Sequence, residues 1–161
     1  MNLLQRNNVR IRSLWLPQHL SDDDTFRTLA SLHRNTHVEE VHARMLRGIQ
    51  GHEGGEAVRD HLLVNRNIKD LDIDQWCIQD QRRRLGPEGA TRIAQALFNP
   101  LCILKVLKLK ECRIGNDGML ALGEALQTNT TLEELNDDGN RINLGEATRR
   151  DMTLQRLSLS H

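Results

Sequence analysis

The sequence repeats itself, and this internal repeat constrains the fold more than any other feature. The segment GPEGATRIAQAL from Gly86 aligns with GNDGMLALGEAL from Gly115, 29 residues later. The segments LKVLKLKECRI from Leu104 and LEELNDDGNRI from Leu132 align at an offset of 28 residues. Both of these are close to the pattern L-x-x-L-x-L-x-x-(N/C)-x-L, followed by a small-residue turn and an amphipathic stretch. One such unit cannot bury its own apolar face, so neighbouring units are expected to stack into a solenoid.

The same template fits further back and further on in the chain, at starts separated by 22 to 36 residues. Leucines at its first, fourth and sixth positions point inward, because alternate residues of a strand face opposite sides. Apolar residues spaced i, i+4 then pack a helix against the outside of each strand. The template predicts parallel strands over 11–16, 38–43, 68–73, 104–109, 132–137 and 154–159. It predicts intervening helices over 24–33, 55–64, 87–98 and 116–127.

This template resembles the leucine-rich repeat, specifically the ribonuclease-inhibitor-like subtype, in which repeats of about 28 residues each carry a full helix. The resemblance implies an α/β fold: a right-handed leucine-rich-repeat solenoid of about six repeats. It further implies a parallel sheet on the concave side and helices on the convex side. We expect a single solenoid over 1–161, with regular repeats over 53–161 and divergent repeats over 1–52.

The charge balance excludes several classes of function. The chain carries 22 Lys and Arg residues against 22 Asp and Glu residues. This balance argues against a nucleic-acid partner and against a polybasic membrane-surface protein. No apolar segment has the length of a membrane span, and the N-terminus lacks the apolar stretch of a secretory signal. The three cysteines show no disulfide-framework spacing, so we expect free thiols in the cytoplasm, with cytoskeletal or nuclear locations left open.

A search for chemistry-bearing motifs indicates no enzymatic function. The sequence contains no phosphate-binding or dinucleotide-binding glycine motif. His52 opens the segment HEGGE, which lacks the second histidine of a zinc-protease helix and whose glycines we expect to interrupt a helix. Cys112 occupies the Asn/Cys position of the template, so we expect it to pack in the core. We therefore predict no catalytic residue, metal site, cofactor or small-molecule substrate.

The template also predicts a binding surface. Residues that alternate with the inward leucines line the concave face, in a central column and a neighbouring column. Trp15 either contacts a partner or packs beneath a neighbouring segment. An insertion after the third strand carries three arginines, which form either a solvated loop or a grip for an acidic partner or phosphate. The predicted partner-binding residues are Trp15, His42, Arg44, Asp72, Asp74, Lys108, Lys110, Arg82, Arg83 and Arg84.

Two departures from the template bear on this interpretation. Asp137 occupies an inward leucine position, so either its repeat is distorted or the carboxylate is solvated near an end. Neither end of the chain shows a polar capping unit, which solenoids need for solubility. The chain is then either a divergent or truncated member of a longer family, or its ends are covered by partner subunits.

These observations favour a non-catalytic protein–protein interaction scaffold, a leucine-rich-repeat subunit or module of a larger assembly. Protein partners would bind the concave face and the uncapped ends. The family resemblance also implies an alternative, a small-GTPase regulator resembling the Ran GTPase-activating protein, although that family's catalytic residues have no counterparts that we can place here. A nucleic-acid-sensing or innate-immune fragment is a third interpretation. A GTP turnover assay would distinguish the first two.

Overall fold

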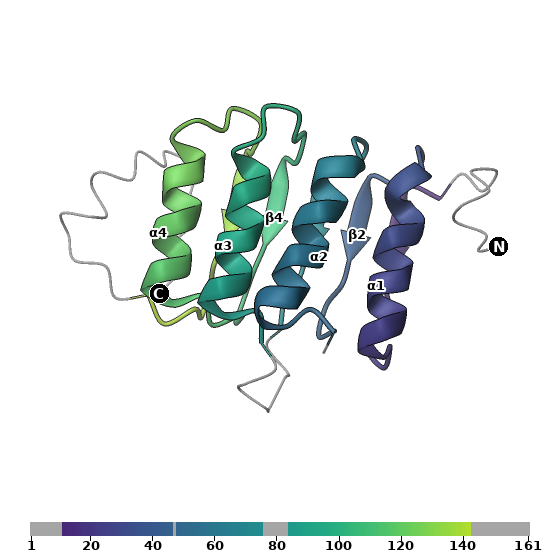
Figure 1. Ribbon diagram of the computed structural model, residues 1–161, viewed down its shortest axis with the longest axis horizontal. Helices are drawn as coiled ribbons and strands as arrows, with labels where there is room; N and C mark the ends of the chain where they lie inside the picture. Colours follow the sequence, from purple (N-terminus) through teal and green to yellow (C-terminus); the bar gives the residue numbers. More distant parts are fainter. Residues whose placement is uncertain (1–10, 47, 76–83, 143–161) are drawn as a thin grey trace.

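The computed structural model describes residues 11–46, 48–75 and 84–142. Over these residues, five short strands form one parallel sheet in the order β1-β2-β3-β4-β5 (Figure 1). The strands are β1 (Ser13–Trp15), β2 (Glu40–His42), β3 (Asp70–Asp72), β4 (Val106–Lys108) and β5 (Glu134–Asn136). The helices are α1 (Asp22–Ser31), the short 3-10 helix η2 (Leu32–Arg34), α2 (Gly51–Val64), α3 (Gly86–Leu97) and α4 (Gly115–Leu126).

The strand register follows the repeat template. Leu14 pairs with Val41, Val41 with Leu71, Leu71 with Leu107, and Leu107 with Leu135. Each of these residues holds the fourth position of its repeat, so equivalent positions form continuous rows across the sheet. The first five predicted strands and their parallel order are thus confirmed. The predicted sixth strand, over 154–159, lies outside the described residues.

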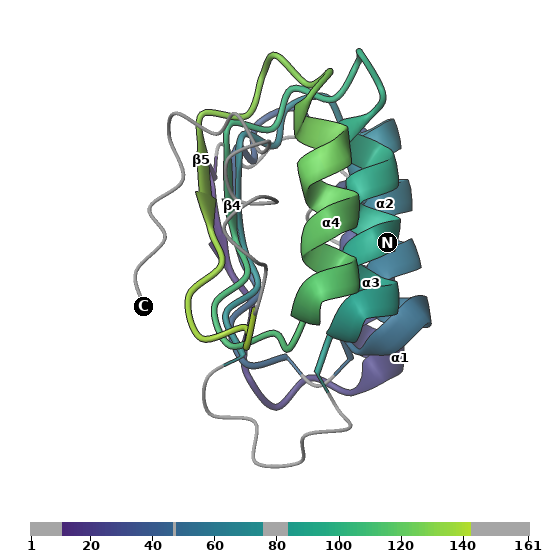
Figure 2. The ribbon, with the colours of Figure 1, turned by 90° about the vertical axis from the view of Figure 1, so that its left-hand side faces the viewer.

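The molecule has two layers, with the sheet on one side and the helices on the other (Figure 2). The apolar core fills the space between them and is built from aliphatic side chains of the inward template positions. Leu107 is completely buried between Leu71 and Leu135, as predicted. None of the helices in the described part of the chain combines the length and apolar character that a membrane crossing requires.

Helix α2 begins earlier in the sequence than expected. It begins at Gly51 instead of residue 55, and it continues through Gly54 and Gly55. The expectation that these glycines interrupt a helix is therefore wrong. A Cβ atom on Gly55 would lie 2.4 Å from the backbone oxygen of Gly89 in α3. The missing side chain lets the two helices approach at this point, and tertiary packing outweighs the low helix propensity of glycine.

Asparagines after the helices form a ladder that the template analysis did not identify. Asn65 donates from Nδ2 to the Leu32 carbonyl of the preceding repeat, at 2.5 Å, and accepts at Oδ1 from the Ile68 backbone N–H. Asn129 repeats this arrangement, donating to the Leu97 carbonyl at 2.8 Å. Such bonds pair backbone groups that would otherwise be buried without partners. The recurring asparagines are Asn35, Asn65, Asn99 and Asn129.

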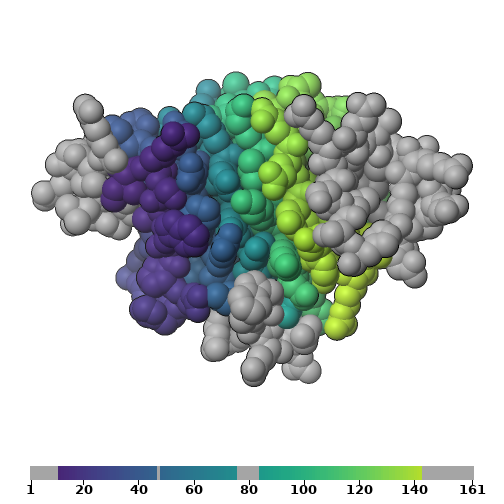
Figure 3. All heavy atoms as spheres, turned by 180° about the vertical axis from the view of Figure 1, so that it is seen from behind, coloured from purple at the N-terminus to yellow at the C-terminus, as the bar shows by residue number. Residues whose placement is uncertain are grey.

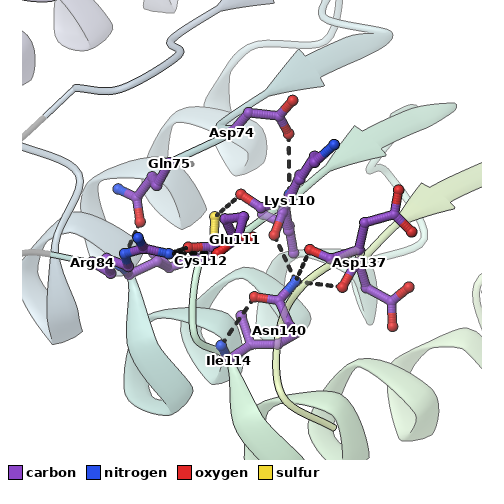
Figure 4. A network of polar contacts seen from close by, with 12 residues as sticks. Asp74, Gln75, Arg84, Lys110, Glu111, Cys112, Ile114, Asp137 and Asn140 are labelled. Atoms are coloured by element: carbon purple, nitrogen blue, oxygen red, sulfur yellow. Dashed lines mark hydrogen bonds and ion pairs between the residues drawn. The ribbon is translucent and has the colours of Figure 1, made fainter. Parts of the chain in front are cut away.

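A second ladder occupies the bends after the strands (Figure 4). Asn140 donates from Nδ2 to the Leu109 carbonyl at 2.7 Å, and Cys112 donates from Sγ to the Ile73 carbonyl at 3.2 Å. These bonds confirm the core role predicted for Cys112, and burial raises the pKa of its thiol well above the usual value. Gln75 makes an equivalent bond to the Ile49 carbonyl, at 2.6 Å.

Asp137 is 3 % exposed, so its carboxylate is not solvated. Its Oδ2 atom has no hydrogen-bond partner among the described residues. Burial raises the pKa of this carboxyl above its ordinary value. The repeat therefore keeps an inward-pointing carboxylate where the template places leucine.

Candidate functional site

The sheet face opposite the helices, here called the open face, carries the predicted binding columns. Its side chains alternate with the inward row of partly buried Leu14 and buried Val41, Leu71 and Leu107, so they point away from the core. Figure 3 shows the repeats as adjacent stripes across this side of the molecule. Register places the central residues side by side in the order Trp15, His42, Asp72, Lys108 and Asn136.

Trp15 is 62 % exposed, so it is not packed beneath the described residues, and its contact with a partner stays a prediction. Its indole stacks on the His42 ring, with centroids 4.0 Å apart and ring planes inclined by 19°. The guanidinium carbon of Arg44 lies over the indole at 5.4 Å from the ring centroid. Stacking and cation–π attraction both favour this arrangement. The described structure thus presents a large aromatic side chain to solvent while restricting its orientation.

Asp72 lies beneath this group instead of at the surface. Its side chain is completely buried, which corrects the expectation that it contacts a partner. Its Oδ2 accepts a hydrogen bond from Arg44 Nε at 2.5 Å and lies 3.5 Å from His42 Nδ1. Its Oδ1 accepts from the Asp74 backbone N–H at 3.2 Å. The short carboxylate side chain, in the middle of the sheet, is covered by longer neighbours and holds them in place.

The two lysines extend the open face along β4. Lys108 lies in register with Asp72, but its ammonium is nearest Asp70, with 3.9 Å between Nζ and Oδ2. Lys110 is exposed, and only its backbone N–H contacts Asp74, at 3.0 Å from Oδ1. Burial raises the pKa of both the Asp70 and Asp74 carboxyls. The predicted Asp74–Lys110 contact therefore exists, but it joins side chain to backbone and leaves the ammonium exposed.

The arginine loop differs from expectation at its last residue. The Arg84 side chain is 7 % exposed and forms an ion pair with Glu111, with 3.0 Å between Nη1 and Oε2. Arg84 also donates to the Glu111 carbonyl oxygen (Figure 4). The next residue, Leu85, is buried, and its backbone N–H donates to the Gln75 side chain. The chain has therefore rejoined the core at Leu85. Arg84 is therefore a structural residue, while Arg82 and Arg83 lie outside the described residues.

A row of ion pairs borders the open face on the side where the strands begin, and sequence reasoning did not identify it. Glu39 accepts from Arg12 Nε at 3.1 Å and from Lys69 Nζ at 3.0 Å. The hydrogen bond from Lys69 is the main cause that lowers the pKa of Glu39. Lys105 and Glu133 continue the row, with 2.6 Å between Nζ and Oε1. The signal was present in the sequence as a charged residue at the second template position of each of these five repeats, but exposed pairs of this kind contribute little stability.

The chemistry available at the open face is that of recognition. It offers an aromatic plane, an arginine and two lysines, all of which bind side chains without making or breaking covalent bonds. Among the described residues, no group of three or more His, Cys, Asp or Glu side chains is arranged to hold a metal ion. The structure thus brings together Trp15, His42 and Arg44, with Asp72 as their buried support, and places Lys108 and Lys110 on the same face.

No protein-family model matches the chain. It is similar to mouse NACHT, LRR and PYD domains-containing protein 12, with 32 % identity over 95 residues covering 56 % of this chain. The human protein of the same name is 32 % identical over 74 residues, or 46 % of this chain. The matched part spans 8 % of the mouse protein and 6 % of the human protein.

Two solved structures resemble this fold closely. One is the leiomodin-1 actin-binding site 2, with a TM-score of 0.70, 19 % identity, and coverage of 92 % of this chain and 80 % of that one. The other is the tropomodulin C-terminal domain of Caenorhabditis elegans, with a TM-score of 0.70, 11 % identity, and coverage of 92 % and 83 %. At these identities, the similarity concerns the arrangement of the backbone.

Proposed function

We propose that this chain, which has a leucine-rich-repeat fold, is a non-catalytic protein-binding module whose partner docks on the open face. The observation that carries the proposal is the indole of Trp15, which stacks on the His42 ring and is largely exposed to solvent. Tryptophan is enriched among the residues that dominate binding energy at protein interfaces. An exposed indole of this size in a chain with only 2 % aromatic residues has no role in the described core.

The support beneath Trp15 strengthens this proposal. Buried Asp72 restrains Arg44, and both His42 and Arg44 restrain the indole. A side chain that is already ordered loses less conformational entropy when a partner binds. The leiomodin-1 structure with a similar fold is an actin-binding site. That activity belongs to leiomodin-1, but it supports the idea that a backbone of this shape suits recognition of a protein.

The scaffold role and the cellular location belong to the same proposal. Cys102 and Cys112 are both free and buried thiols, which suits a reducing compartment such as the cytoplasm. We place the module within a larger assembly, where the open face contacts one protein partner.

The experiment compares binding with folding in the same variants. The wild-type chain and the Lys108→Glu/Lys110→Glu double variant are used as bait for affinity capture, followed by mass spectrometry and thermal melting. We expect the double variant to lose its partner while its melting temperature stays within about 2 °C of wild type. Arg66→Glu, in the exposed turn after α2, makes the same kind of charge change away from the strands and should keep the partner. Retention of the partner by the double variant would show that it binds elsewhere.

A further inference from the structure

In the central and neighbouring columns of the open face, from β2 to β4, the most exposed charged side chains are cations. The Asp72 carboxylate is fully buried, and the partly buried Asp74 carboxylate accepts from the Lys110 backbone N–H. In contrast, the Arg44 side chain is 41 % exposed, and Lys110 is exposed as well. A partner that approaches this region therefore meets cations first, although the whole chain carries no formal net charge. Complementary charge would come from carboxylates.

Arg44 is arranged to receive such a carboxylate. Its Nε atom donates to buried Asp72, and its two terminal nitrogens have no hydrogen-bond or ion-pair partner among the described residues. A guanidinium presents its remaining N–H groups in a planar fork that matches a carboxylate. The same guanidinium lies over Trp15, at 5.4 Å from the ring centroid. One residue of the partner can therefore contact the arginine while the next contacts the indole.

We infer that the open face binds an extended, acidic segment of a partner protein, which places an apolar side chain on Trp15 and carboxylates on Arg44 and the β4 lysines. This inference rests on the proposed function and specifies its partner. Neighbouring strands lie about 4.8 Å apart, so β2 and β4 are separated by roughly 10 Å. An extended peptide advances about 3.4 Å per residue. Two carboxylates about three residues apart therefore match Arg44 and Lys108 or Lys110.

The arrangement favours a protein segment over a nucleic-acid strand. Glu40 and Glu134 share the open face with the cations, with a side-chain exposure of 34 % for Glu40 and an exposed Glu134. A continuous phosphate backbone that crosses the strands would meet these carboxylates and be repelled. A peptide can place neutral residues at those points. RNA nevertheless belongs in the test, because bases also stack on exposed indoles.

Tryptophan fluorescence provides the measurement, because the chain has only two tryptophans. A Trp76→Phe variant leaves Trp15 as the sole reporter, and circular dichroism verifies its fold. The probe is a synthetic peptide of about ten residues, with one leucine followed by aspartates about two and five residues later. A second peptide replaces each aspartate with lysine. Each peptide is titrated to about 2 mM, a concentration that reveals even weak association.

We expect the acidic peptide to change Trp15 fluorescence saturably and the lysine peptide to leave it unchanged. Lys110→Glu and Arg44→Gln should each weaken binding by about tenfold, while Arg66→Glu should change it by less than about twofold. Raising the salt concentration from about 50 to about 500 mM should weaken binding several-fold. Lys110→Glu is the safer variant for folding, because the Lys110 side chain forms no hydrogen bond or ion pair with another described residue.

Three results would overturn the inference. The two peptides could bind equally, the acidic peptide could fail to bind, or polyuridylate RNA could change Trp15 fluorescence where the acidic peptide does not. Capture with the Lys108→Glu/Lys110→Glu variant separates this inference from the proposed function. If that variant loses its partner while the acidic peptide fails, the open face is the docking surface and the partner class is wrong. If the variant keeps its partner, both proposals fail.

Discussion

The first repeat and the central repeats of this molecule differ in how closely they follow the template. In the central repeats, α2, α3 and α4 approach one another at glycines: a Cβ on Gly89 would lie 2.6 Å from the Gly51 oxygen, and one on Gly118 would lie 2.9 Å from the Ala90 side chain. In the first repeat, β1 ends in an exposed Trp15, and its Leu14 is only partly buried. The regular repeats therefore pack closely through their helices, while the divergent repeat leaves a large aromatic side chain exposed.

The largest expected effect comes from the same substitution at equivalent positions of the two regions. Leu107→Ala, in β4, removes a fully buried side chain with neighbours on both sides and should cost roughly 2–5 kcal/mol of unfolding free energy. Leu14→Ala, in β1, should cost less than about half as much, because Leu14 is only partly buried. Urea denaturation of both variants measures the difference. Equal losses would mean that the first repeat is packed as tightly as the centre.

The boundary between the two regions contains a buried histidine that should make stability depend on pH. His61 of α2 is 1 % exposed, and its ring stacks on His33 of η2 with centroids 5.5 Å apart. Burial, together with the charge of His33, lowers the pKa of His61 from 6.5 to about 4. Between these two values the unfolded chain binds a proton that the folded chain does not, so stability falls as the pH falls.

We expect this histidine to remove about 3 kcal/mol of stability as the pH drops from 6.5 to 4, relative to a chain without it. The measurement is urea denaturation at several pH values for wild type and His61→Leu. The difference between the two curves isolates His61 from the carboxylates that titrate in the same range. A difference that does not change with pH would contradict the burial of a neutral imidazole at this boundary.

A smaller effect is expected at β5, where a regular repeat departs from the template. Asp137→Leu should be neutral or should stabilise the protein by about 1–2 kcal/mol, because the carboxylate is buried and Oδ2 has no partner among the described residues. The raised pKa of Asp137 means that the folded state favours the protonated form, so any gain should shrink toward low pH. Clear destabilisation in chemical denaturation at pH 7 would reveal a polar role for Asp137.

Much of the fold could be predicted from the sequence because the repeat template is periodic in its apolar residues. Strand register, helix order and the buried role of Cys112 all follow from template positions that recur along the chain at steps of 22 to 36 residues. The start of α2 could not be predicted in this way. Glycine is favoured at position 55 because α2 approaches Gly89 closely there, and not because of its own helix propensity. The asparagine ladder was visible in the sequence, since asparagine recurs at the end of each helix, as at Asn65 and Asn129.

The location of the candidate site could be predicted from the sequence, but the burial of its individual side chains could not. Alternation placed Trp15, Arg44 and Asp72 on the same face, and the structure agrees. Alternation cannot indicate that a short carboxylate lies beneath a longer arginine, so the roles of Asp72 and Arg84 were missed. The sequence left two environments possible for Trp15. Strand β1 pairs with one described strand only, and the template does not predict what covers its other edge.

We propose that recognition takes place on the open face, from β1 to β4, and hydrogen–deuterium exchange tests this proposal most directly. The chain is measured alone and when saturated with the partner recovered by affinity capture. We predict slower exchange in the backbone amides of 13–17, 40–44 and 106–110, and unchanged exchange along the outer surfaces of α2, α3 and α4. Protection confined to the helices, with no change in these strand segments, would contradict the claim.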